Sequence, residues 1–186
     1  KPLVESGYLP LGPSGVAESS ASGQVPTIEG IRKAVTSRTK ALLYCSPSNP
    51  TGTVFSRRQL EELAELCLEH QLMVITDEAY EYFVYDGHRH FSMASIPEMR
   101  RNVISCYTFT KTYAMTGWRL GYGIMPQELA QKMTQIQINA TSCTCTFAQV
   151  AGTEGIRGDQ SASNAMVAEF KKRRDVIVDG LNAIEG

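Results

Sequence analysis

Three short polar segments of this sequence contain the side-chain types that chemistry at a carbonyl carbon requires. They are residues 49–52, 77–80 and 108–119, which together supply an amide, a carboxylate, a phenol, an amine and a guanidinium. The amine belongs to Lys111. An amine forms an imine with a carbonyl carbon, and it does so best when its pKa is lowered. The sequence therefore indicates a lysine that binds a carbonyl compound.

The other side chains of these segments match the remaining needs of one carbonyl cofactor. A pyridine nitrogen needs a carboxylate to keep it protonated, because the protonated ring withdraws electrons from a carbanion. A phosphate needs a guanidinium together with hydroxyl and backbone donors. A ring hydroxyl needs donors that favour its anion, and an amide and a phenol supply them.

Each residue also has an ordinary explanation when it is taken alone. Asn49 precedes a proline, which is typical of a turn, and an aspartate at a strand end, such as Asp77, is typical of a cap. Lys111 beside threonines is typical of a solvated lysine, and Arg119 of a surface ion pair that contributes little. When the residues are considered together, these ordinary explanations are less favoured than cofactor binding, because the whole set fits one cofactor.

Alternating strands and helices must position these segments. Compact apolar runs predict buried strands at residues 41–45, 72–76 and 102–107, and a fourth at 120–125 follows without an obvious crossover helix. One helix is expected to begin at Thr27 and a second to follow a capping box. Further helices are expected around residues 129–136 and over residues 162–183. This order predicts an α/β fold with a mostly parallel sheet. Such sheets place their sites beyond the carboxyl ends of the strands, where the polar segments lie.

The apolar positions of each helix predict which face is buried. The capping box consists of Ser56 and Gln59. The expected inward positions are Leu60, Leu63, Ala64 and Cys67, then Leu129, Met133 and Ile136, and finally Val167, Phe170, Ile177 and Leu181. A short strand at Leu9–Leu11 and a loop over Gly12–Gln24 complete the expected order.

Composition narrows the functional classes. The chain has 186 residues, of which 42% are hydrophobic and 20% charged, as in one ordinary globular unit. A net charge of -1 gives no electrostatic reason to expect nucleic acid or an anionic membrane as partner, and no apolar run is long enough to span a membrane. Five cysteines, an odd number without a disulfide pattern, favour a reducing compartment and hence the cytoplasm. Cys143 and Cys145 lack partners at zinc-site spacing, so no metal is expected.

The string Lys-Thr-Tyr-Ala-Met-Thr-Gly-Trp-Arg-Leu-Gly-Tyr, which begins at Lys111, is highly specific. Together with the Asn-Pro-Thr-Gly and Asp-Glu-Ala-Tyr segments, it resembles the class I/II aminotransferases of fold type I, which are aspartate-aminotransferase-like. The match runs from about Thr27 to the end of the chain. The resemblance implies a three-layer α/β large domain with a mostly parallel sheet and pyridoxal 5′-phosphate as cofactor.

The resemblance also implies roles around the cofactor ring. Lys111 forms the Schiff base, and after its release it acts as the general base at the substrate α-carbon. Asp77 pairs with the pyridine nitrogen. Tyr80 and Asn49 contact the ring oxygen, and Lys111, Asp77 and Tyr80 form the catalytic set.

The resemblance also implies that Thr108 and Arg119 bind the phosphate of the cofactor. Thr110 is a further candidate, whose hydroxyl bonds either the phosphate or a backbone group.

Several neighbouring residues are expected to be structural. Glu78 points away from Asp77 by strand alternation. Trp118 and Tyr113 are expected to pack rather than touch substrate. His88 and His90 follow an Asp-Gly turn and are expected at the surface.

Members of the family are usually much longer than this chain. By resemblance, residues 1–25 match poorly, and residues 26–186 form a partial pyridoxal-phosphate-binding large domain without the small C-terminal domain. The glycine-rich phosphate loop and the arginine for the substrate carboxylate are not found. We therefore expect an incomplete sheet, and a segment that alone binds cofactor weakly.

The resemblance implies an aminotransferase that moves an amino group between an amino acid and a 2-oxo acid and that forms a homodimer. A C–S lyase or related elimination enzyme on the same scaffold is an alternative, because the cofactor supplies the electron sink in both reactions. A non-catalytic ligand-sensing domain of aminotransferase type is a second alternative.

Overall fold

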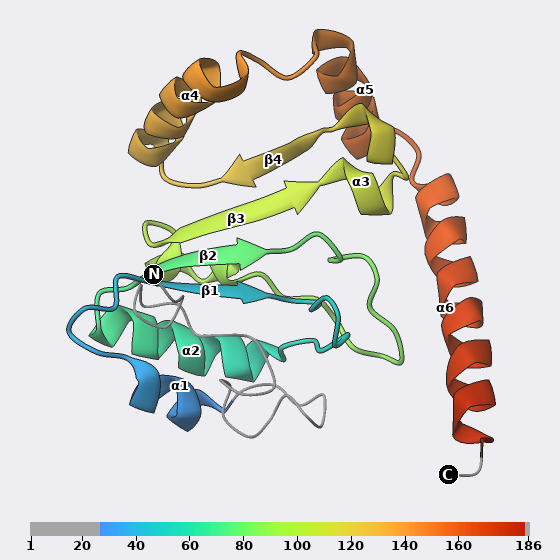
Figure 1. The fold of residues 1–186 in the computed structure, drawn as a ribbon, viewed down its shortest axis with the longest axis horizontal. Helices are drawn as coiled ribbons and strands as arrows, with labels where there is room; N and C mark the ends of the chain where they lie inside the picture. Colours follow the sequence, from blue (N-terminus) through green and yellow to red (C-terminus); the bar gives the residue numbers. More distant parts are fainter. Residues whose placement is uncertain (1–26, 185–186) are drawn as a thin grey trace.

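The computed structural model describes residues 27–184, which form an α/β fold around one open, four-stranded sheet (Figure 1). The strands are β1 (Ala41–Cys45), β2 (Met73–Asp77), β3 (Val103–Thr108) and β4 (Gly121–Ile124), in the spatial order β1-β2-β3-β4. The first three are parallel and β4 runs antiparallel to β3. The predicted α/β class and mostly parallel sheet are confirmed, whereas the expected strand at Leu9–Leu11 and loop at Gly12–Gln24 lie outside the described residues.

The direction of β4 follows from the segment that connects it to β3. Parallel neighbours need a crossover connection, usually a long helix. Here the connection holds only the single turn α3 (Phe109–Thr112) and the 3-10 turn η5 (Thr116–Trp118). The chain therefore doubles back, and Thr108 pairs with Gly121. The missing crossover helix noted in the sequence is the local sign of this reversal.

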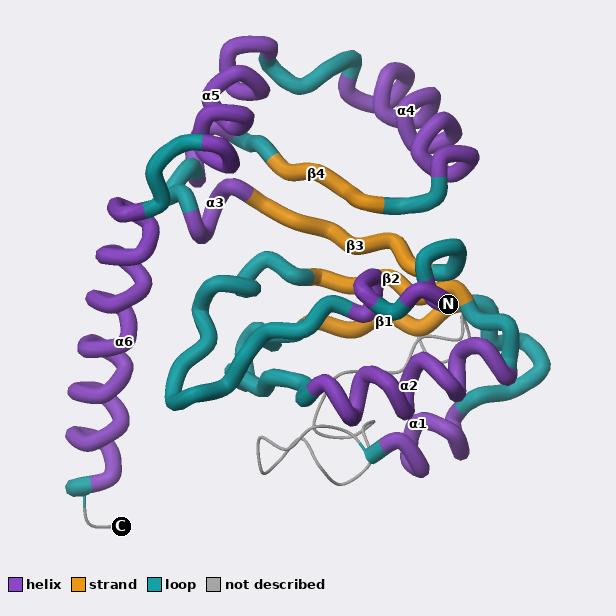
Figure 2. The backbone as a smooth tube through the Cα atoms, turned by 180° about the vertical axis from the view of Figure 1, so that it is seen from behind, coloured by secondary structure: helices purple, strands orange, loops and turns teal. Residues whose placement is uncertain are grey.

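One face of the sheet is covered by α1 (Ile28–Ala34) and α2 (Arg57–Glu69), which lie together beside β1 (Figures 1 and 2). Helix α2 begins at the predicted capping box, in which Ser56 and Gln59 exchange hydrogen bonds. Its buried residues join the inward strand side chains in one hydrophobic cluster, whose members include Leu60, Leu63, Ala64, Leu66, Cys67, Leu42, Tyr44, Val74 and Val103. The predicted inward stripe of this helix is confirmed.

The opposite face of the sheet is open in the part of the chain that is described. Successive strand residues point to opposite faces, so Leu43 is 41% exposed between the buried Leu42 and Tyr44. Asp77 and Cys106 are exposed on neighbouring strands. The open face carries one of the predicted site residues.

Three long helices follow the sheet: α4 (Gln127–Thr141), α5 (Thr146–Arg157) and α6 (Ser161–Asn182). Helix α5 packs closely, because Gly152 lies against Leu120 and Phe109 and leaves no room for a side chain. Helix α6 instead extends away beyond the strand ends (Figures 1 and 2). No helix among residues 27–184 is both long enough and apolar enough to cross a membrane. Two further 3-10 turns, η3 (Met93–Ser95) and η4 (Pro97–Met99), precede β3.

The predicted inward faces of α4 and α6 are wrong for this structure. Ile177 and Leu181 are 60% and 63% exposed, and Met133 and Ile136 are also exposed. The periodic pattern correctly identified helices with an apolar stripe. It could not identify what the stripe packs against, and within residues 27–184 most of these side chains are exposed. The remaining positions, Leu129 and Val167, are half-buried, and Phe170 is exposed but touches Phe83 edge-on at 5.5 Å between ring centroids.

Candidate active site

The three polar segments meet at one edge of the sheet, because each follows the carboxyl end of a parallel strand. Asn49 lies in the loop after β1, Asp77 is the last residue of β2, and Lys111 lies in α3 directly after β3 (Figure 1). This is the edge at which open α/β sheets bind their ligands. The predicted placement of the segments is confirmed.

Side chains from all three segments approach one another at Tyr80. The Asn49 Nδ2 donates a hydrogen bond to the Tyr80 hydroxyl at 3.5 Å. The Lys111 Nζ lies over the Tyr80 ring, 5.2 Å from its centroid. An ammonium over a phenol ring is attracted by the electrons of the ring face. Three residues that are far apart in sequence, an amide, a phenol and an amine, therefore form one polar group.

Asp77 lies at the end of β2 with an exposed carboxylate. Its Oδ1 accepts a hydrogen bond from the backbone N–H of Ala79 at 3.0 Å, which closes a short turn after the strand. Cys45 and Cys106 are its register partners on the two neighbouring strands. Burial raises the pKa of both thiols, and the Asp77 charge raises the pKa of each further. Asp77 is thus a negative charge at the carboxyl end of β2, on the open face of the sheet.

The predicted phosphate residues lie where α3 begins. The Thr108 hydroxyl caps this helical turn by accepting from the Thr110 N–H at 3.1 Å, and it donates to the Leu120 carbonyl at 3.4 Å. The Phe109 N–H donates to the same carbonyl at 3.1 Å. Arg119 directly precedes Leu120, so these contacts bring the arginine backbone to the start of α3.

Arg119 adopts a left-handed backbone conformation with φ 52° and ψ 48°. Such a conformation costs about 1–3 kcal/mol in a residue with a side chain, and it is concentrated at binding sites. The exposed guanidinium donates to the Thr116 carbonyl at 2.9 Å through Nη1. Among residues 27–184 the guanidinium makes no further hydrogen bond, so its remaining donors can bind an anion.

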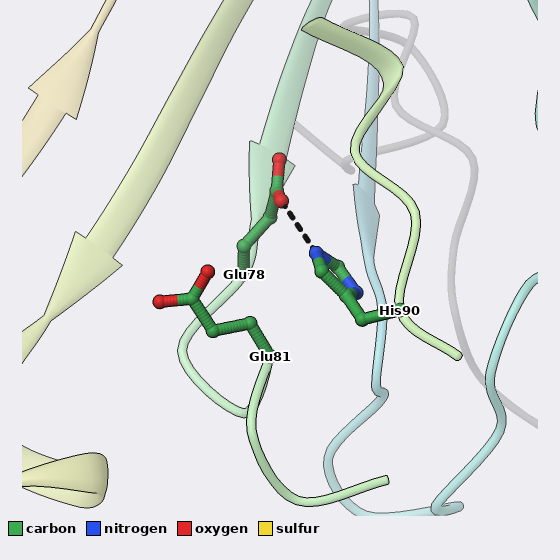
Figure 3. Close-up of side chains that lie close together, drawn as sticks. All are labelled: Glu78, Glu81 and His90. Atoms are coloured by element: carbon green, nitrogen blue, oxygen red, sulfur yellow. Dashed lines mark hydrogen bonds and ion pairs between the residues drawn. The ribbon is translucent and has the colours of Figure 1, made fainter. Parts of the chain in front are cut away.

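Glu78 and His90 form a pair that the sequence did not predict. Glu78 is buried and points away from Asp77, as expected, but His90 is half-buried and its Nε2 lies 2.8 Å from Glu78 Oε2 (Figure 3). The prediction that His90 lies at the surface is wrong, whereas His88 is exposed. A glutamate that strand alternation turns into the core needs a polar partner. That requirement was the signal that could have identified His90.

The aromatic neighbours of Lys111 pack as expected. Tyr113 lies 5.4 Å from Phe109 between ring centroids, and its hydroxyl donates to Gln160 Oε1 at 3.3 Å. Trp118 is exposed and touches Phe147 edge-on at 6.0 Å. No contact within residues 27–184 brings either ring to the polar group formed by Asn49, Tyr80 and Lys111.

Comparison with known proteins identifies the scaffold that carries this group. The family model described as aminotransferase class I and II matches residues 16–186. The chain belongs to this family. Its members are generally dependent on pyridoxal phosphate. The α/β fold of the structure and the family matched by the sequence therefore agree.

Individual relatives of this chain agree with the family assignment. It is 40% identical over 158 residues to aromatic-amino-acid aminotransferase 2 of Thermococcus litoralis, covering 84% of the chain and 41% of that protein. The crystal structure of the aspartate aminotransferase of Rhizobium meliloti matches with a TM-score of 0.86 and 38% identity, over 90% of this chain and 42% of that one. An aromatic aminotransferase of Pyrococcus horikoshii matches with a TM-score of 0.85 and 38% identity, over 90% and 45%. The chain spans less than half the length of these relatives.

Proposed function

We propose that the protein is a pyridoxal-phosphate-dependent aminotransferase that moves an amino group from an amino acid to a 2-oxo acid. The observation that carries this proposal is the Lys111 amine above the Tyr80 ring, with Asn49 bonded to the same phenol. Membership of the aminotransferase family supports it.

The residues present fit pyridoxal phosphate by the chemistry of their donors. The cofactor, when bound, supplies an aldehyde carbon and a pyridine ring that withdraws electrons from the substrate α-carbon. The exposed Asp77 carboxylate suits the ring nitrogen, and the hydroxyl of Tyr80 with the amide of Asn49 suits the ring oxygen. A separate set of residues suits the phosphate, namely Thr108 and Thr110 at the start of α3 and Arg119, which directly precedes Leu120.

Each residue of the site has a defined task in this proposal. The Lys111 Nζ would hold the cofactor at its carbonyl carbon, and as a free amine it would take the proton from the substrate α-carbon. Asp77 holds a proton on the ring nitrogen by its opposite charge. Tyr80 and Asn49 donate hydrogen bonds that keep the ring oxygen anionic. Arg119 fixes the phosphate and so orients the ring, because a guanidinium binds phosphate through two parallel hydrogen bonds.

The direct test is a transamination assay with the full-length protein. Aspartate and an aromatic amino acid are the first donors to test, because the relatives are named for these substrates. With pyridoxal phosphate and 2-oxoglutarate added, we expect each productive donor to yield its own 2-oxo acid and glutamate in equal amounts. Release of pyruvate and a thiol from a cysteine conjugate, without transfer to 2-oxoglutarate, would instead establish the C–S lyase alternative.

Replacing Arg119 with alanine tests the phosphate assignment. Loss of a charged phosphate contact is expected to raise the dissociation constant of pyridoxal phosphate about tenfold or more, since a hydrogen bond to a charged group contributes about 1.5–3 kcal/mol. Binding of pyridoxal, which lacks the phosphate, should change little. Equilibrium dialysis with both compounds measures the difference. Arg157→Ala, at an exposed arginine in the last turn of helix α5, is the control. Equal weakening of both compounds by Arg119→Ala would contradict the assignment.

We also propose a homodimer in the cytoplasm, as in the expectation from sequence. The five cysteines, all within the described residues, are free thiols, which supports a reducing compartment. Sedimentation of the full-length protein at two concentrations tests the dimer.

A further inference from the structure

The turn that carries Asp77 and Tyr80 is attached to the fold by the residue between them. Glu78 is 2% exposed, whereas Asp77 is exposed. The Glu78 N–H donates to the Cys106 carbonyl on β3 at 3.0 Å, and the Glu78 carbonyl accepts from the Glu81 N–H at 3.2 Å. The backbone of the turn is therefore fixed at Glu78, while its neighbours face the candidate active site.

The Glu78 carboxylate is held by four side chains from three parts of the fold. The hydroxyls of Thr76 and Ser92 donate to Oε1 at 2.6 and 2.8 Å. The Tyr107 hydroxyl donates to Oε2 at 3.2 Å, and His90 Nε2 lies 2.8 Å from the same oxygen (Figure 3). These partners come from β2, from β3 and from the segment before η3. One carboxylate thus connects the turn over residues 77–80 to β2, to β3 and to the segment before η3.

A buried carboxylate with this many partners is poorly explained by stability alone. Burial raises the pKa of Glu78, but the hydrogen bonds from His90, Thr76 and Ser92 outweigh it, and the pKa is held below its usual value. The group is therefore ionised at neutral pH. Replacing buried ionic groups by apolar side chains is often neutral or stabilising, and in some proteins such groups act by specifying one geometry. Four directional bonds to one carboxylate constrain the turn more than an apolar contact would.

We propose that Glu78 is a positioning residue, with His90 as its main partner, that fixes the turn over residues 77–80 and so orients Asp77 and Tyr80 toward the cofactor. Two contacts link the turn to the site: the bond from Ala79 N–H to Asp77 Oδ1 at 3.0 Å, and the position of the Tyr80 ring 5.2 Å below Lys111 Nζ. A small rotation of the turn alters both. The proposal rests on the proposed function.

A metal ion is the competing explanation of the same cluster. Ligand atoms of Glu78, Glu81 and His90 lie within 4.8 Å of one another (Figure 3). However, both Glu78 oxygens already accept hydrogen bonds, and a metal would have to replace some of them. The bonds favour positioning, and the metal becomes an outcome of the test.

The test compares Glu78→Gln with Glu81→Gln in the full-length protein. The first variant nearly keeps the shape of Glu78 but puts an amide where an acceptor is required, whereas the second removes a charge from the same cluster without removing any bond to Glu78. Amide hydrogen exchange in the cofactor-free protein is the readout that does not depend on activity. We expect faster exchange over residues 79–81 in Glu78→Gln only, with β1 and α2 unchanged. With cofactor, kcat should fall about tenfold to a hundredfold while KM for the amino donor stays within about twofold, because misplaced groups affect the reacting geometry.

Three results would overturn the proposal. The first is a lower melting temperature of Glu78→Gln while its local hydrogen exchange, kcat and KM equal those of Glu81→Gln. That result would mean that Glu78 only stabilises the fold. The second is a stoichiometric metal in the purified protein that Glu78→Gln loses. If Glu78→Gln does not fold, Ser92→Ala takes its place, because it removes only one donor to Glu78, and it is expected to show the same changes in smaller degree. The third overturning result is normal hydrogen exchange over residues 79–81 in Ser92→Ala. Absence of transamination in the unmodified protein would count against the proposed function alone, since hydrogen exchange still measures the turn.

Discussion

Replacing Lys111 with alanine is expected to lower the transamination rate by about 10⁴-fold or more, because in the proposed function one amine both binds the cofactor and moves the substrate proton. General base catalysis by itself contributes about 10²–10⁴-fold, and loss of the covalent attachment adds to this. The amine is exposed and positioned by the short turn α3 above Tyr80. Fold stability should change little, since an exposed lysine contributes little to it.

Borohydride reduction followed by mass spectrometry provides a measurement that does not need turnover. Reduction fixes a lysine-bound cofactor as a stable adduct, so the unmodified protein should gain one cofactor mass on the peptide that contains Lys111. Lys111→Ala should gain none, and Lys132→Ala, an exposed lysine on α4, should behave as the unmodified protein. A reducible adduct in Lys111→Ala would show that another amine binds the cofactor.

Lys111→Arg separates the chemistry of the amine from its charge. A guanidinium stays protonated in proteins, so it keeps the charge over Tyr80 but cannot act as a base. We expect this variant to be as inactive as the alanine variant. Substantial activity in the arginine variant would mean that the positive charge alone matters.

The parts of the fold that were predictable have local signals in the sequence. In the compact apolar run at residues 41–45, Leu42 and Tyr44 are buried in the same cluster as α2, and the capping box at Ser56 and Gln59 is where that helix begins. The meeting of Asn49, Tyr80 and Lys111 followed from one rule, that parallel strands end at the same edge. Local pattern and simple topology together therefore predicted which segments form the candidate site.

The parts that were not predictable depend on partners far along the chain. Ile177 and Leu181 lie at helical spacing, but the spacing does not reveal that α6 leaves the sheet. The Glu78–His90 pair joins residues that a loop separates, and only the path of that loop brings the ring to the carboxylate. The ordinary Asp-Gly turn before His90 favoured a surface position. Burial of a polar pair is decided by tertiary structure, which a periodic pattern does not contain.

Replacing Asp77 with asparagine is expected to lower kcat by about 10²–10³-fold, the usual loss when one aligned electrostatic group is removed from an active site. Asparagine keeps the size of the side chain and its carbonyl can still accept from Ala79 N–H, so the turn should remain. It lacks the negative charge that favours a protonated ring nitrogen. Affinity for the cofactor should fall far less than kcat, because the phosphate donors are on a different element. Equal losses in kcat and in cofactor affinity would contradict a role at the ring nitrogen.

A thiol readout checks the position of the Asp77 charge without cofactor. Burial raises the pKa of Cys106, and the negative charges of Asp77 and Glu78 raise that pKa further, because they disfavour a thiolate. Asp77→Asn should therefore lower the Cys106 pKa, while burial still keeps it above the ordinary value. The pH dependence of Cys106 alkylation in the cofactor-free protein, followed by mass spectrometry, should shift to lower pH in this variant. An unchanged profile would mean that the carboxylate does not face the open side of the sheet, and its assignment to the ring nitrogen would then lose its structural basis.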